Sequence, residues 1–333
     1  MGDAAASSPP AAHQVVVPEA LHGVRLDKAV VVLVPELSRA RVKRAIELGA
    51  VRVNGRRMRK GGNVTTGDIL QVDVSQVAEA APLPQPEAPL RLVLRRSDVI
   101  VVDKPAGQPT APLRPAETGT LVNALLGHFP ELVPLGPDEF IGHSIRDPGV
   151  VHRLDTETSG AIVVALTKDA FDELRSALKD GHLEKTYLLV CAEQGLPDSG
   201  TIELPIANHP KDQRRVFACV HPLDVMRYQP RPARTDYRVV RRAGIWALVE
   251  ARADKALRHQ LRAHFAAIGH ALAGDELYGG SVIRALGRHA LHAATVSYAG
   301  GPMVAAFEAT VALPKEIVTL LDAAQQASPE ATS

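Results

Sequence analysis

The spacing of apolar residues predicts two short helices followed by a small sheet near the start of the chain. Residues 24–34 place their apolar side chains at helical intervals. Ser38 is a suitable N-cap for a second helix, which Gly49 ends. Residues 51–58 predict a strand that enters a tight Asn-Gly turn, and residues 65–74 predict a Gly-Asp turn and another alternating strand. This pattern is typical of a small α/β domain.

A different pattern follows, in which apolar runs of strand length are mixed with helical segments. A helix is predicted from Asp169, a suitable N-cap, to about Lys179, with Gly181 just beyond it. A second amphipathic segment covers residues 257–268 and ends at Gly269. Because strands and helices do not alternate regularly, we predict an α+β fold with a mixed or antiparallel sheet flanked by helices. The predicted strands are residues 98–107, 160–169 and 185–193, with strand–turn–strand hairpins at 235–253 and 294–311.

Stretches rich in alanine, serine and proline divide the chain into domains. Residues 1–17 are expected to be a disordered tail, and residues 77–90, which hold four prolines, a semi-rigid linker. Between them, residues 18–76 have the size of a small domain. The larger domain covers residues 91–317, and a polar, alanine-rich tail is expected over residues 318–333.

Positive charge is concentrated in the small domain, although the whole chain of 333 residues has a formal net charge of only +1. Residues 38–60 hold nine lysines and arginines against one acidic residue, Glu47. A solvated helix face is the usual explanation for a charge run. So strong an imbalance on a short segment favours a phosphate-binding surface instead. The nine cations are Arg39, Arg41, Lys43, Arg44, Arg52, Arg56, Arg57, Arg59 and Lys60.

The composition argues against a membrane protein and against a metal site. No apolar run approaches the ~20 residues that span a bilayer, and the first residues lack the pattern of a secretory signal. We therefore expect a cytoplasmic protein with no membrane contact. Cys191 and Cys219 have no metal-ligand spacing. His259, His264 and His270 are five and six residues apart, which matches no His-x-x-x-His zinc site, so no metal is expected.

A polar segment between two apolar runs is the strongest candidate for chemistry. Residues 152–160, HRLDTETSG, form a loop of the kind that often carries reactive residues, and Asp155 is its candidate carboxylate. From these residues alone, the alternative is that Asp155 only organises a turn with the hydroxyl groups that follow it. Further along, Arg258 and Arg262 are one helical turn apart and can project from the same face.

The small domain resembles a known RNA-binding module. Its segments GVRLDKAV, LSRARVKRAIELGAVRVNGRRM and GDIL are similar to the alpha-L RNA-binding motif, which was first recognised in a small-subunit ribosomal protein. The resemblance implies binding of structured RNA through the second predicted helix and the Asn-Gly hairpin. The residues that we expect to contact RNA there are Arg39, Arg41, Lys43, Arg44, Arg56 and Arg57.

The larger domain resembles the RluA-type family of RNA pseudouridine synthases over about residues 94–313. Six motifs follow that family's order: DKPAG, HRLDTETSG, EKTYLLV, HQLRAHFAAIGH, GDELYGG and RHALHA. The resemblance implies that Asp155 is the catalytic carboxylate. It also implies that Tyr187 stacks on the target base and that Arg262 pairs with Asp155. His152, Arg153 and Arg258 are expected to contact RNA.

The reaction that this resemblance implies needs no cofactor. Conversion of uridine to pseudouridine breaks the bond from ribose to the base nitrogen, turns the base and rejoins it through carbon. The Asp155 carboxylate can attack the sugar or remove a neighbouring proton, and the sequence leaves both routes open. The uridine must first be extruded, and Tyr187 is expected to receive it. The other residues that match the motifs, expected to be mainly architectural, are Lys104, Pro105, Gly274, Asp275 and Tyr278.

One segment departs from the family's pattern. The family has Gly-Arg-Thr before His-Gln, whereas this chain has Ala256, Leu257 and Arg258. A shift of the arginine by one residue turns its direction on a helix by about 100°. We expect this departure to affect the choice of substrate.

The sequence therefore predicts a monomeric enzyme that isomerises uridines in RNA, most directly in large-subunit ribosomal RNA. Transfer RNA stays open as a target. The alternative is a non-catalytic RNA-binding or ribosome-assembly factor that retains the synthase fold. A third class, a hydrolase of a nucleoside or sugar bond, needs a second carboxylate roughly 5–10 Å from Asp155, for which Glu157 is the near candidate.

Overall fold

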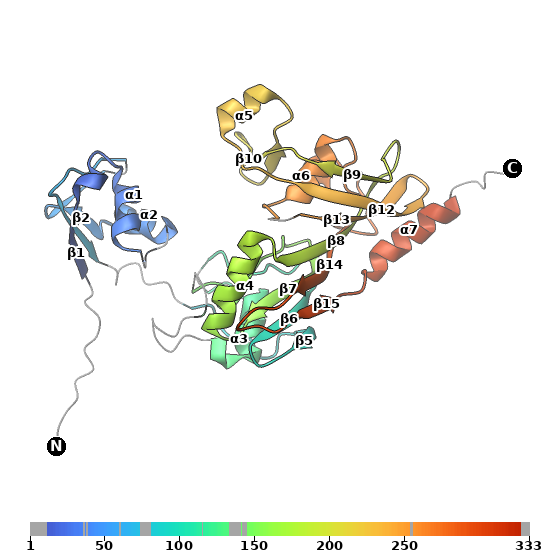
Figure 1. The fold of residues 1–333 in the computed structure, drawn as a ribbon, viewed down its shortest axis with the longest axis horizontal. Coiled ribbons are helices and arrows are strands. Elements are labelled where there is room, and N and C mark those ends of the chain that lie inside the picture. Colours follow the sequence, from blue (N-terminus) through green and yellow to red (C-terminus); the bar gives the residue numbers. More distant parts are fainter. Residues whose placement is uncertain are drawn as a thin grey trace, which may run out of the picture. The chain divides into compact units, whose positions relative to one another are not determined.

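A computed structural model describes residues 12–35, 37, 39–59, 61–73, 81–114, 116–132, 141, 145–253 and 256–327. The chain forms two compact units, Met1–Ala80 and Ala81–Ser333. Each unit has a hydrophobic core of its own. Figure 1 shows the helices and strands of both units.

The small unit packs two helices against a four-stranded antiparallel sheet. Leu26 and Val30 from the first helix and Val42 from the second are fully buried in its core, beside Leu70 and Val72 from the sheet. The strand order is β1-β4-β2-β3. The elements are β1 (Ala12–Val16), η1 (Glu19–Leu21), α1 (Leu26–Leu33), α2 (Arg39–Leu48), β2 (Val51–Val53), β3 (Arg56–Arg57) and β4 (Ile69–Asp73). The predicted pair of helices followed by a small sheet is confirmed.

A tight turn joins β2 to β3. Asn54 and Gly55 have φ angles of 51° and 78°, the left-handed conformation that two-residue hairpin turns require. The Asn54 side chain also accepts a hydrogen bond from the Ile69 backbone N–H at 2.9 Å, which ties the turn to β4. The turn therefore presents Arg56 and Arg57 as exposed side chains at the edge of the sheet.

The predicted disordered tail is wrong for residues 12–17. Strand β1 pairs with β4 from Ala12 opposite Asp73 to Val16 opposite Ile69, and Val17 is buried. This segment follows the alanine- and proline-rich run and is rich in valine, which favours strands. It covers the edge of β4 that faces away from β2. The prediction for residues 1–11 lies outside the described residues.

The large unit is built on a nine-stranded mixed sheet, which confirms the predicted α+β class. The strand order is β5-β6-β7-β14-β8-β13-β12-β9, and β15 pairs with β14. Strands β7 and β14 are parallel, and the other described pairs are antiparallel. The strands are β5 (Leu92–Arg95), β6 (Val99–Lys104), β7 (Ser159–Ala165), β8 (Leu183–Ala192), β9 (Ser199–Ile202), β12 (Thr235–Ala243), β13 (Trp246–Arg252), β14 (Leu291–Tyr298) and β15 (Phe307–Thr310).

Helices and a small hairpin complete the large unit. Helix α4 (Lys168–Asp180) packs on β7 and β8, whereas α7 (Lys315–Ala327) packs on β12 and β13 (Figure 1). The N-cap of α4 is Thr167 rather than the predicted Asp169, because the Thr167 hydroxyl accepts the Ala170 N–H at 3.3 Å. The other elements are α3 (Leu121–His128), η3 (Pro130–Leu132), β10 (Ile206–Asn208), β11 (Val216–Ala218), α5 (Pro222–Tyr228), α6 (Gln260–Ala267) and η4 (Glu276–Tyr278).

Most of the predicted linker belongs to the large unit. Residues 77–80 lie outside the described residues, but residues 81–90 are held against α3. The Gln85 N–H donates to the Asn123 carbonyl at 2.8 Å, and the Asn123 side chain donates to the Leu83 carbonyl at 2.7 Å. Because these bonds come from a partner distant in sequence, the proline-rich composition gave no sign of them.

The predicted C-terminal tail is wrong as far as residue 327. Those residues continue α7, and Leu321 is only 1% exposed. Alanine favours helix, and Ile317, Leu321 and Ala324 recur at the helical interval and pack in one cluster. Residues 328–333 lie outside the described part of the chain.

The two predicted hairpins of the large unit are present, but one connection is longer than expected. In the first, Ala243 pairs with Trp246 around a two-residue turn. In the second, Tyr298 pairs with Phe307, so residues 299–306 form a loop rather than a tight turn. The Glu173 carboxylate of α4 holds this loop by accepting hydrogen bonds from the Tyr298 hydroxyl and the Met303 N–H, at 3.0 and 2.8 Å.

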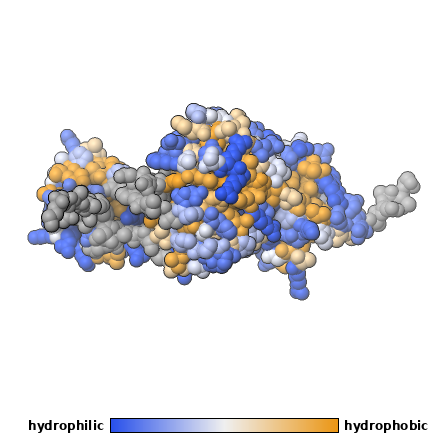
Figure 2. Space-filling model, turned by 90° about the horizontal axis from the view of Figure 1, so that it is seen from below, coloured by the Kyte–Doolittle hydropathy of each residue, from blue (hydrophilic) through white to orange (hydrophobic). Residues whose placement is uncertain are grey.

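The surface of the protein mixes polar and hydrophobic residues. On the face shown in Figure 2, hydrophobic residues gather in patches with polar residues around them. Among the described helices, none combines the length and the apolar character needed to cross a membrane.

Candidate active site

The loop before β7 carries Asp155 and is fixed by backbone contacts. The Val151 N–H donates to the Val163 carbonyl at 3.0 Å, and the Thr158 N–H donates to the Asp155 carbonyl at 3.0 Å. Strand β7, which follows, is buried along its whole length. The side chain of Asp155 itself is 26% exposed. The loop thus presents a partly accessible carboxylate from a rigid support, as sites that need precise geometry require.

A glycine and a lysine hold the ends of this loop. Gly160 has φ 116°, and a Cβ on it would lie 2.1 Å from the Ala293 carbonyl oxygen, so the approach of β14 to β7 requires glycine there. Lys104 is fully buried, and its Nζ donates to the carbonyls of Pro105, Gln108 and Thr156 at 2.8, 2.8 and 3.0 Å. Lys104 therefore organises the loop beneath Asp155.

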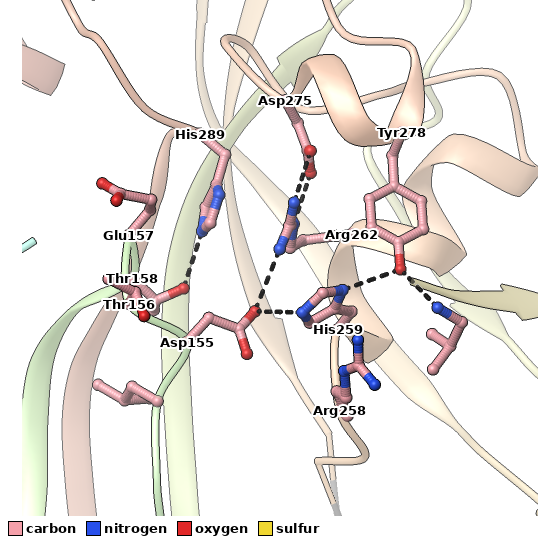
Figure 3. A network of polar contacts seen from close by, with 12 residues as sticks. Asp155, Thr156, Glu157, Thr158, Arg258, His259, Arg262, Asp275, Tyr278 and His289 are labelled. Carbon is pink, nitrogen blue, oxygen red and sulfur yellow. Dashed lines mark hydrogen bonds and ion pairs between the residues drawn. The ribbon is translucent and has the colours of Figure 1, made fainter. Parts of the chain in front are cut away.

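Arg262 joins Asp155 to a second carboxylate. Its Nη1 lies 3.3 Å from Asp155 Oδ2, whereas its Nε and Nη2 donate to the two oxygens of Asp275 at 2.7 and 2.8 Å (Figure 3). The Arg262 side chain is 7% exposed and that of Asp275 is 1% exposed. Burial disfavours the charged guanidinium, but the two carboxylates outweigh burial and raise the pKa of Arg262. The bidentate pair fixes the direction in which Arg262 meets Asp155.

His259 is a neighbour of Asp155 that the sequence did not reveal. Its Nε2 lies 3.6 Å from Asp155 Oδ2, and its Nδ1 lies 3.0 Å from the Tyr278 hydroxyl (Figure 3). Burial lowers the pKa of His259 and outweighs the Asp155 carboxylate, which raises it, and the guanidinium groups of Arg262 and Arg258 lower it further. The ring is therefore neutral at neutral pH, and its approach to Asp155 is not an ion pair.

The neighbours of Tyr278 indicate which ring nitrogen of His259 carries the proton. The Val216 N–H donates to the Tyr278 hydroxyl oxygen at 3.0 Å. That hydroxyl can then donate to Nδ1 of His259, which leaves the proton on Nε2, the atom facing Asp155. In the sequence, the spacing of His259 from the other histidines was used only to argue against a zinc site. The feature that could have placed His259 near Asp155 was its position three residues before Arg262.

Tyr187 lies on β8 in the core next to the site. Its Cα is paired with Ala251 on one side and Ala293 on the other, and the residue is 5% exposed. Burial raises the pKa of Tyr187, and the Asp155 carboxylate raises it further. The phenol is therefore protonated at neutral pH, and Tyr187 lies close enough to Asp155 for the carboxylate to influence its pKa.

The other residues of the predicted site are placed differently from one another. His152 is 7% exposed and its Nε2 accepts the Val163 N–H at 3.2 Å, so only its Nδ1 is left for the contact with RNA, which stays a prediction. Arg153 is exposed on the same loop. Arg258 is exposed and donates to the carbonyls of Gln213 and Arg214, which ties it to the loop between β10 and β11.

The segment that departs from the family's pattern is strained at its first residue. Ala256 has φ 27°, a left-handed value that favours glycine, which is the residue that the resemblance places there. Leu257 packs against a small cluster that includes Ile206 and Val216. Its side chain is thus part of the core beneath the β10–β11 hairpin, and the arginine of this segment is used one residue later, at Arg258.

The cations of the small unit are mostly exposed, as a phosphate-binding surface requires. Lys43, Arg44, Arg52, Arg56 and Arg59 are exposed, and Arg41 is half-buried. Arg57 is exposed and donates to the Leu48 carbonyl at 3.2 Å, at the end of α2. The side chain of Arg39, and the whole of Lys60, lie outside the described residues.

The Asp155 carboxylate lies beside Arg262 and beside two hydrogen-bonded rings, those of His259 and Tyr278. Among the described residues, no group of three or more histidine, cysteine, aspartate or glutamate side chains could hold a metal ion. A carboxylate presented in this way can act as a nucleophile or as a general base. The residues around it supply positive charge, a neutral N–H donor and an aromatic face.

Comparison with known proteins identifies both units. A family described as RNA pseudouridylate synthase matches residues 98–267, which include Asp155, Tyr187 and Arg262, and a family described as S4 domain matches residues 24–70. A relative in Yersinia pestis, "Ribosomal large subunit pseudouridine synthase D", is 32% identical over 321 residues, which are 92% of this chain and 93% of the relative. An "Uncharacterized RNA pseudouridine synthase" of Aquifex aeolicus is 34% identical over 260 residues, 77% of each chain.

A solved structure shares the fold. The protein described as "Human RNA Pseudouridylate Synthase Domain Containing 1" is 24% identical and superposes with a TM-score of 0.54. The match covers 74% of this chain and 98% of that chain.

Proposed function

This chain belongs to the RNA pseudouridylate synthase family, and on that premise we propose that it converts specific uridines of large-subunit ribosomal RNA to pseudouridine, with Asp155 as the catalytic carboxylate. The name of the Yersinia pestis relative supports ribosomal RNA as the substrate class. The observation that carries the role of Asp155 is its contact with Arg262, which Asp275 holds in place.

The proposed reaction rearranges one nucleotide without adding or removing atoms. The bond between C1′ of the ribose and N1 of the uracil breaks, while the Asp155 carboxylate attacks the sugar or takes a neighbouring proton from it. The uracil then turns so that C5 bonds to C1′. In the first route the bond from Asp155 to C1′ breaks as this bond forms, and in the second Asp155 returns the proton to the sugar. The proton on C5 is released, and N1 takes one up. Both routes need the carboxylate beside the sugar and the base free to turn.

The residues around Asp155 support these steps. Arg262 keeps a positive charge beside the carboxylate, and His259 offers it an N–H donor. Extrusion of a uridine from its stack costs a few kcal/mol. The ring of Tyr187 would offset part of that cost by stacking on the base.

The decisive test is to map pseudouridine in unmodified large-subunit ribosomal RNA after incubation with the protein. We expect the wild type to produce pseudouridine at one or a few positions, and Asp155→Ala to produce none. Unmodified transfer RNA serves as the second substrate. If neither RNA is modified by wild-type protein that binds RNA, the non-catalytic RNA-binding factor becomes the better assignment.

A second prediction concerns the small unit, which we propose as an RNA anchor. Deletion of residues 1–80, the boundary between the two units, should weaken RNA binding and reduce its dependence on salt. Each phosphate contact contributes about 0.9 to the slope of log affinity against log salt concentration. Loss of two or three contacts should therefore lower the slope by about 2 to 3. Filter binding across a salt series measures this.

The full-length variant Arg56→Gln/Arg57→Gln is a milder control for this deletion. It should lower the slope by less than the deletion does, because the exposed cations of α2 remain. A deletion protein that folds normally and keeps the full slope would show that the basic residues of the small unit are an ordinary solvated face.

A further inference from the structure

A cluster of buried and half-buried basic groups lies next to the active site, and no carboxylate of the described residues is paired with it. Lys185 precedes Tyr187 by two residues on β8, so the two side chains lie on the same face of the strand, about 7 Å apart. Arg175 comes from α4, and His152 comes from the loop that carries Asp155. We call these three residues the basic cluster.

Lys185 is the least expected member of this cluster, because a lysine is rarely buried without a partner. The residue is 7% exposed, and among the described residues no hydrogen-bond acceptor or acidic side chain is paired with its Nζ. Unlike Nδ1 of His152, this atom is not enclosed and reaches solvent. Burial lowers the pKa of Lys185 to about 8, and the neighbouring Arg175 guanidinium acts in the same direction. The amine is still mainly charged at neutral pH, and none of the described residues provides a counter-ion.

His152 adds an unused donor to the same cluster. Because its Nε2 accepts the Val163 N–H, the proton of the neutral ring is on Nδ1. That Nδ1 is enclosed and has no partner among the described residues. Burial lowers the pKa of His152, as do Lys185 and Arg175, so the ring is neutral and its nearest charged groups are cations.

Arg175 gives the cluster its access to solvent. It is half-buried, and its Nη1 donates to the Val151 carbonyl at 2.7 Å. A guanidinium has five N–H donors, and no other acceptor among the described residues is paired with this one. Arg175 and Lys185 therefore form the accessible side of the cluster, and His152 lies behind them.

We propose that the basic cluster binds one backbone phosphate of the RNA substrate, at the nucleotide in the active site or at its immediate neighbour. A phosphate supplies the missing counter-ion and several acceptors at once. The short distance along β8 from Lys185 to Tyr187 places that anion within one nucleotide of the base. The inference rests on the proposed function for the identity of the RNA, but not for the presence of an anion site.

The test uses the full-length protein with Lys185→Met, and Lys179→Met as the matched control. Lys179 is exposed in the last turn of α4 and lies outside the cluster. We expect Lys185→Met to raise KM for RNA about tenfold, the size of a hydrogen bond to a charged group. The salt slope should fall by about 0.7 to 0.9, as for one lost phosphate contact. Lys179→Met should change neither quantity.

A neutral linkage in the RNA tests the same contact from the other side. A short RNA with one methylphosphonate beside the target uridine should bind the wild type about tenfold more weakly than normal RNA. Lys185→Met should bind both RNAs equally. Because the substitution removes an unpaired buried charge, the variant should also unfold at a temperature no lower than the wild type does.

The possible failures can be told apart. An active wild type with a Lys185→Met variant of unchanged KM and salt slope would overturn the phosphate site and leave the proposed function intact. If no RNA yields pseudouridine, the proposed function fails. The salt slopes of RNA binding by Lys185→Met and Lys179→Met then show, without any activity, whether the anion site exists. If Lys185→Met does not fold, Arg175→Gln takes its place in the same assays.

Discussion

Replacement of Asp155 by asparagine is expected to lower the rate of pseudouridine formation by roughly 10⁴-fold or more, the scale seen when a central catalytic group is removed. Asparagine has nearly the same shape, but it can neither attack the sugar nor accept a proton as a carboxylate does. Because the Asp155 side chain is partly exposed and its loop is held by backbone bonds, the variant should unfold at nearly the wild-type temperature. Release of tritium from uridine labelled at C5 measures the rate.

The matched control for Asp155→Asn is Glu157→Gln. Glu157 lies two residues further along the same loop, and no role in the reaction is proposed for it. Glu157 is half-buried, and its variant should keep the rate within about threefold, because the change removes no reacting group. A large loss with Glu157→Gln would favour a mechanism with two carboxylates. Normal activity in a folded Asp155→Asn variant would remove Asp155 from the mechanism.

Replacement of Arg262 by glutamine is expected to damage both stability and activity. The substitution leaves Asp275, which is 1% exposed, as a buried charge without its bidentate partner. Breaking a buried pair by removing one partner costs about 3–5 kcal/mol. The unfolding temperature should therefore fall by roughly 10 °C. Activity should be lost even at temperatures where the variant is folded, because Asp155 has also lost its cation.

A double variant separates these two effects. In Arg262→Gln/Asp275→Asn the unpaired charge is gone, so calorimetry should show that most of the lost unfolding temperature is recovered. Activity should stay absent, because the group beside Asp155 is still neutral. Recovery of activity together with stability would show that Arg262 serves only to satisfy Asp275. Arg258→Gln, an exposed neighbour on the same segment, is the control for stability.

Much of the local structure could be predicted because neighbouring residues decide it. The Asn54-Gly55 turn and the end of α4 at Gly181 follow from residues that tolerate left-handed backbone. The apolar run of β7 and the two-residue turn between β12 and β13 follow from local periodicity. These features need no knowledge of what packs against them.

Three of the wrong predictions share one cause, which is a partner far away in sequence. Residues 12–17 form a strand because β4 has an open edge, and residues 81–90 are held because Asn123 meets their backbone. The loop at 299–306 is held by Glu173, which lies on helix α4. Composition describes a segment's own preference, and such contacts override it.

For the proposed active site, the sequence by itself indicated Asp155, Tyr187 and Arg262 but not His259. The motifs around Asp155, Tyr187 and Arg262 indicated the family and the reaction, because residue types and their order are properties of the chain alone. Only the tertiary structure decided how they meet: Asp155 and Arg262 are 107 residues apart, and Asp275 and His259 complete their surroundings. The unpaired basic cluster likewise exists only in the fold. Distances, burial and the absence of a counter-ion among the described residues depend on how β14 and β8 pack beside β7, and local sequence does not encode that packing.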